Sequence, residues 1–102
     1  MQQKVQDFNN RSRMSEPLPV HARLLDVSSE LGELAKEYLK ATDYGSTGFT
    51  ITKEFEEEFG DVLYSILSLA NELNINANKA LDIVLNKYQA RIDKKKSMGS
   101  GN

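Results

Sequence analysis

The stretch FEEEFGDVLYSILSLANEL, residues 55–73, carries the clearest structural signal in this 102-residue chain. Its apolar residues recur at intervals of three and four, which is the period of a helix with one buried face and not that of a strand. The residues that share this spacing are Phe55, Phe59, Val62, Leu63, Ile66, Leu67, Ala70 and Leu73. Thr52 suits an N-cap, and the acidic run at 54–58 suits the positive end of a helix dipole. We therefore predict a helix from about residue 52 to residue 73.

Three further helices are predicted on either side of this one, over residues 3–13, 19–41 and 77–95. Pro17 and Pro19 end the first, because proline cannot continue a helix but suits the first turn of the next. The segment 42–50 contains Gly45 and Gly48 and is predicted to be a loop.

Short connections place consecutive helices side by side and antiparallel, so the predicted fold is all-α, with a four-helix bundle-type protomer. It has a short N-terminal helix, two long central helices and a C-terminal helix. Residues 1–96 are predicted to form one domain, and the glycine- and serine-containing tail 97–102 to be disordered.

Composition excludes several classes of function. The net charge is −2, so no basic surface for a nucleic-acid polymer or a membrane is expected. Without cysteine the chain has no disulfides, zinc thiolates or cysteine nucleophile. No apolar run approaches the roughly 18 residues of a membrane span, and the N-terminus lacks the apolar core of a secretory signal. The expected location is the cytoplasm.

Two matching acidic turns lie within the two long helices, ELGEL at residues 30–34 and EFGDV at residues 58–62. In each turn, two acids lie one helical turn apart and surround an apolar residue and a glycine. At about 100° per residue, both acidic pairs flank the apolar stripe of their helix instead of lying opposite it. When the two stripes pack, the four carboxylates can therefore converge at the seam.

Converging carboxylates repel one another, and a bound divalent cation removes the repulsion. Ligation by oxygen alone favours Mg²⁺, with Mn²⁺ as a substitute. A di-iron centre would need Glu-x-x-His turns, and the single histidine, His21, has no acid three residues before it. Acids beside an apolar stripe can also be solvated flank residues, so these turns do not by themselves establish catalysis.

The two motifs in combination resemble the signature of the all-α nucleoside triphosphate pyrophosphohydrolases, specifically the MazG-like proteins. The resemblance covers roughly residues 20 to 92. It is carried by SELGELA at 29–35, EEFGDVLY at 57–64, LANEL at 69–73, Asn86-Lys87-Tyr88 and Arg91-Ile92.

This resemblance implies Mg²⁺-dependent hydrolysis of a nucleoside or deoxynucleoside triphosphate at the α–β bond, giving a monophosphate and pyrophosphate. It implies that the metal ligands are Glu30, Glu33, Glu58 and Asp61, one of which also orients or deprotonates the attacking water. Lys87 and Arg91 lie four residues apart on one helical face and can neutralise phosphate oxygens. The implied assembly is a homodimer or a dimer of dimers, and the implied role is nucleotide-pool cleansing.

The sequence leaves open the substrate preference and two alternative functions. Some relatives selective for deoxycytidine carry an aromatic residue four positions after the second motif's aspartate, where this chain has Ser65. The base preference is therefore undetermined. A phosphoribosyl-ATP pyrophosphohydrolase, built on a related bundle, is the alternative enzyme. A non-catalytic helical dimerisation or nucleotide-sensing module is the alternative outside enzymes.

Overall fold

The computed structural model describes residues 1–12 and 19–100, and every regular element within them is helical. The four helices are α1 (Gln2–Ser12), α2 (Val20–Ala41), α3 (Lys53–Glu72) and α4 (Ala77–Ser100). The all-α prediction is confirmed, and the ends of the first three helices agree with the predicted ends to within one residue. The predicted break at Pro17 lies outside the described residues.

Helix α3 begins where the sequence predicts, because Thr52 caps it. The Thr52 hydroxyl accepts a hydrogen bond from the backbone N–H of Phe55 at 3.1 Å. This contact satisfies one of the donors that the first turn of a helix leaves without a partner. Thr52 therefore fixes the position along the chain at which the acidic turn of α3 starts.

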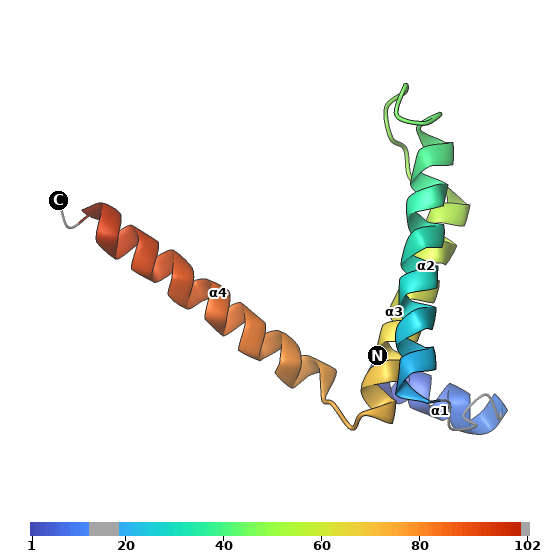
Figure 1. Cartoon of the computed structure of the whole chain (residues 1–102), viewed down its shortest axis with the longest axis horizontal. Coiled ribbons are helices and arrows are strands. Elements are labelled where there is room, and N and C mark those ends of the chain that lie inside the picture. The colour runs from blue at the N-terminus through green and yellow to red at the C-terminus, as the bar shows by residue number, and fades with distance from the viewer. Residues whose placement is uncertain (13–18, 101–102) are drawn as a thin grey trace.

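The connection between α2 and α3, residues 42–52, begins with a tight turn built on the buried Thr42. The Thr42 hydroxyl donates to the carbonyl of Tyr38 at 2.9 Å and accepts from the N–H of Gly45 at 3.1 Å. Asp43 and Tyr44 have φ values of 48° and 58° and precede Gly45 at 87°, so the chain reverses through three left-handed residues. This reversal lays α2 and α3 side by side and antiparallel (Figure 1).

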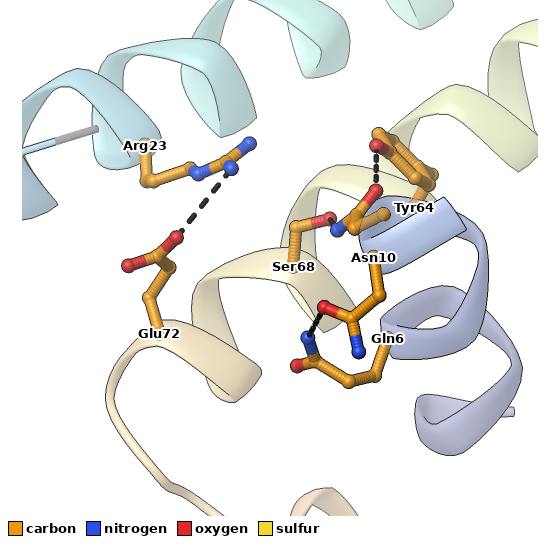
Figure 2. A network of polar contacts seen from close by, with 7 residues as sticks. Gln6, Asn10, Arg23, Tyr64, Ser68 and Glu72 are labelled. Atoms are coloured by element: carbon orange, nitrogen blue, oxygen red, sulfur yellow. Dashed lines mark hydrogen bonds and ion pairs between the residues drawn. The ribbon is translucent and has the colours of Figure 1, made fainter. Parts of the chain in front are cut away.

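Helix α1 packs against the C-terminal half of α3 through polar contacts. The side chain of Asn9 is buried, donates to the Ser68 hydroxyl at 3.2 Å and accepts from the Tyr64 hydroxyl. Figure 2 shows this network beside the ion pair of Arg23 and Glu72, which joins the start of α2 to the end of α3 with 3.5 Å between Nη2 and Oε1. Polar contacts thus tie α1, α2 and α3 together at one end of the molecule.

Helix α4 does not complete a bundle with the helices of its own chain. It leaves the turn at the end of α3 and projects away from the α2–α3 pair (Figure 1). The expectation that short connections make neighbours of all consecutive helices is therefore wrong for α3 and α4. The reason is that Asn74, at φ 55°, redirects the chain, and α1 already covers part of α3.

The C-terminal helix is also longer than predicted. It ends at Ser100, whereas the sequence predicts an end near residue 95. The described part of the predicted tail is helical, since the three lysines at 94–96 have a high helix propensity and extend the helix through the following residues. Residues 101 and 102 lie outside the described residues.

The single chain has a small core and a large surface. Its accessible surface is 8057 Å² and its radius of gyration 18.3 Å, against about 5,800 Å² and about 13 Å expected for a compact monomer of this size. Leu67 and Ala70 are the buried apolar residues of the described part of the chain. None of the described helices combines the length and apolar character that a membrane crossing requires.

Candidate metal centre

Three of the four predicted carboxylates meet at the seam between α2 and α3. One oxygen each from Glu30, Glu58 and Asp61 lies within 4.8 Å of the others. Glu58 and Asp61 are one turn apart on α3, and the antiparallel packing of α2 brings Glu30 against them. The convergence predicted from the two acidic turns therefore occurs within one chain.

Glu33 does not belong to this group of three, although it lies close enough to act on it electrostatically. The pKa of Glu58 is raised above its ordinary value, first by partial burial and then by the negative charges of Asp61, Glu30, Glu33 and Glu37. Repulsion among the carboxylates is thus a property of the folded chain.

Glu37 is a fifth acidic residue at this site, which the motif-based reasoning missed. It is half-buried and follows Glu33 by four residues, so the two share a face of α2. That spacing was the available signal. Its carboxylate also pairs with the Lys40 ammonium at 3.4 Å, which partly neutralises it.

The donor set fits a divalent cation. Glu58 Oε2 is buried and has no hydrogen-bond partner, an arrangement that is costly for a carboxylate oxygen unless something positive satisfies it. The three converging side chains offer oxygen atoms only, which hard cations such as Mg²⁺ and Mn²⁺ prefer. Glu30, Glu58 and Asp61 are therefore the residues that would hold the ion.

The two predicted phosphate-binding residues are not at this site in the single chain. Lys87 and Arg91 lie on α4, which projects away from the α2–α3 pair that carries the carboxylates (Figure 1). Both cations flank the ring of Tyr88, with 5.5 Å from Lys87 Nζ and 5.9 Å from Arg91 Cζ to its centroid. They therefore share a face of α4 with an exposed aromatic residue.

The raised pKa of Glu58 gives a testable pH dependence for the metal-free protein. Between the ordinary value of 4.5 and the raised value in the folded state, folded Glu58 keeps a proton that the unfolded chain has lost. Its contribution to the free energy of unfolding is therefore present at low pH and lost as pH rises through the folded-state pKa. In a chelating buffer, thermal unfolding between about pH 4 and pH 7 should show wild type losing stability relative to Glu58→Gln. If the stabilities of the two proteins changed in parallel with pH, the raised pKa of Glu58 would be contradicted.

Comparison with known proteins places this geometry in a family. A family model described as the MazG nucleotide pyrophosphohydrolase domain matches residues 20–95, which include both acidic turns. The YpjD protein of Bacillus subtilis (strain 168) is 42% identical over an alignment of 78 residues that covers 74% of this chain. The chain covers 66% of the length of that relative.

Two solved structures share the fold. The crystal structure of the Bacillus-conserved MazG protein, a nucleotide pyrophosphohydrolase, matches with a TM-score of 0.70 and 33% identity over 86% of this chain and 84% of that one. The crystal structure of YPJD from Bacillus subtilis matches with a TM-score of 0.70 and 34% identity, over 88% and 90% of the two chains. These findings confirm the resemblance drawn from the acidic turns. The chain therefore belongs to the MazG nucleotide pyrophosphohydrolase domain family, which is a family of hydrolases.

Proposed function

We propose that this protein hydrolyses nucleoside or deoxynucleoside triphosphates at the α–β phosphoanhydride, releasing a monophosphate and pyrophosphate in a reaction that requires Mg²⁺. The observation that carries the proposal is the convergence of Glu30, Glu58 and Asp61 within 4.8 Å, with one buried oxygen of Glu58 left without a hydrogen bond. Membership of the MazG family supports the nucleotide as the substrate. Nucleotide-pool cleansing in the cytoplasm is the role that this reaction would serve.

The four carboxylates have two different roles in the proposed reaction. Glu30, Glu58 and Asp61 hold the cation, which when bound screens the triphosphate charge and makes water a stronger acid. Glu33 lies beside this group but outside it, so its carboxylate is free to orient the attacking water and accept its proton. The two glycines of the acidic turns leave open space, since a Cβ added at Gly32 or Gly60 would meet nothing within 4 Å beyond its sequence neighbours and the backbone of its own helix.

The site is proposed to be completed by a second copy of the chain. Helix α4 carries an unpacked apolar stripe, in which Leu81, Leu85 and Ile92 are about half exposed. The α2–α3 pair carries a matching apolar groove of about 470 Å³, lined by Leu31, Leu34, Ala35, Tyr38, Leu39 and Phe55. Burying these surfaces against each other removes apolar area that the lone chain exposes to water.

Charge supports the same pairing. Lys87 and Arg91 flank Tyr88, which lies between Leu85 and Ile92 on the stripe of α4. The groove includes Leu31 and Leu34, which directly follow Glu30 and Glu33 in α2. Docking α4 onto a second copy would therefore bring two cations towards a region of concentrated negative charge. There they would neutralise the phosphate oxygens of the substrate. The proposed assembly is a homodimer, or a pair of such dimers.

The experiment that tests the activity is a nucleotide panel with product analysis. Purified protein with Mg²⁺ should convert at least one common or modified triphosphate to its monophosphate and pyrophosphate in equal amounts. The panel includes phosphoribosyl-ATP, whose selective turnover would replace the proposed substrate class. No turnover of any nucleotide, in a protein that still binds Mg²⁺, would favour a nucleotide-sensing module instead.

A further inference from the structure

The turn between α3 and α4 is held by a residue from the other end of the chain. The side-chain amide of Gln2, in the first turn of α1, donates to the carbonyl of Ile75 and accepts from the N–H of Ala77 at 2.8 Å. The backbone carbonyl of Gln2 accepts from the Asn71 side chain at 3.2 Å. Gln2 thus contacts the last turn of α3, the connection and the first residue of α4.

These contacts matter because the start of α4 has donors without partners in the helix. The first N–H groups of any helix lack an intrahelical acceptor. Asn76 caps one of them by accepting from the N–H of Lys79 at 3.0 Å. Gln2 satisfies another at Ala77, so the cap of α4 is shared between the connection and α1.

The connection itself contains a residue in a conformation that L-amino acids seldom adopt. Asn74 has a φ of 55°, in the left-handed region. Such a residue persists where its surroundings hold it in place. The Gln2 amide bonds to the backbone of both Ile75 and Ala77. It therefore fixes the chain immediately after Asn74.

Helix α1 has a second anchor that is independent of Gln2. Asn9 bonds to Ser68 and Tyr64, and the rings of Phe8 and Tyr64 meet edge to face at 6.2 Å between centroids. Two turns of α1 separate this anchor from Gln2. Removing the Gln2 amide therefore leaves α1 docked on α3 while releasing the turn.

We propose that Gln2 is a positioning residue that clamps the α3–α4 turn and sets the direction in which α4 leaves the molecule. Within the described residues α4 packs along no other helix, so this turn is where its own chain sets its direction (Figure 1). Through α4, the clamp places Lys87 and Arg91 for the carboxylates of a second copy. This last step rests on the proposed function, whereas the clamp itself does not.

The clamp is tested by hydrogen exchange at the Ala77 amide, measured by NMR on the whole protein. Gln2→Leu removes both side-chain hydrogen bonds, so exchange at Ala77 should quicken by about five- to tenfold or more. Gln2→Glu keeps the acceptor for the Ala77 N–H, with a negative charge at the start of α4, but loses the donor to the Ile75 carbonyl. Exchange at Ala77 in Gln2→Glu should therefore lie between that of wild type and that of Gln2→Leu. The matched control is Gln3→Leu, whose amide donates to the Asp7 carboxylate within α1 and not to the turn, and which should leave Ala77 unchanged.

Equal exchange at Ala77 in Gln2→Leu and Gln3→Leu would overturn the clamp. So would a uniform increase across α1 and α3, because this indicates general destabilisation and not release of the turn. The positioning role has its own readout. Gln2→Leu should raise the KM for nucleotide several-fold with Mg²⁺ affinity unchanged, and a KM equal to that of Gln3→Leu would refute it. If wild type turns over no nucleotide, the proposed function fails while the exchange result still decides the clamp.

Discussion

Replacing Glu58 by glutamine is expected to abolish nucleotide hydrolysis while leaving the protein folded. The substitution keeps the shape of the side chain and removes its charge, so one of three converging ligands no longer attracts the cation. Loss of a ligand should cost more than the roughly 10- to 100-fold that disturbing the hydrogen-bond partners of metal ligands costs. The measurement is the rate of pyrophosphate release with saturating Mg²⁺, together with Mg²⁺ affinity by calorimetry.

Glu56→Gln is the matched control for this prediction. Glu56 lies on the same helix two residues earlier, is exposed, and is outside the converging group. Its removal should leave Mg²⁺ affinity and turnover within a few-fold of wild type. If Glu58→Gln bound Mg²⁺ as tightly as Glu56→Gln, the metal centre would be misplaced.

Mixing two inactive variants is expected to restore activity, because the proposed site draws on two copies. One variant is Glu58→Gln, and the other carries Lys87→Ala and Arg91→Ala together. In a two-fold dimer, an equal mixture gives half mixed pairs with one intact site each, so activity should reach about a quarter of wild type. The measurement is pyrophosphate release after the two chains are unfolded together and refolded.

A second mixture provides the control for this experiment. Glu30→Gln and Glu58→Gln should not restore each other, because both carboxylates converge within one chain. Light scattering on the mixtures shows whether dimers have formed. Mixed dimers without recovered activity in the first mixture would contradict a site shared between copies, and so would a monomer mass near 11.5 kDa.

The helices were predictable because their signals are local. The spacing of apolar residues and the Thr52 cap define α3 within the sequence itself, and the structure starts that helix directly after Thr52. The convergence of Glu30 with Glu58 and Asp61 also followed from helical geometry, since the acids flank stripes that pack on each other. These features depend on neighbours along one helix or on one hairpin.

The direction of α4 was not predictable in the same way. It depends on the left-handed conformation of Asn74 and on contacts from Gln2, more than seventy positions earlier. The spacing of apolar residues along the sequence does not indicate a contact between residues so far apart. The separation of Glu33 from the converging group likewise depends on how closely α2 and α3 pack.

The outward course of α4, with the proposed completion of the site by a second copy, has a consequence for the protein in dilute solution. A site assembled from two chains forms by mass action, so the fraction of complete sites falls as the protein is diluted below the dissociation constant of the pair. Rate per chain would then fall with dilution, whereas a self-contained enzyme would keep a constant rate per chain. The abundance of the protein would itself regulate its activity, with no effector other than another copy.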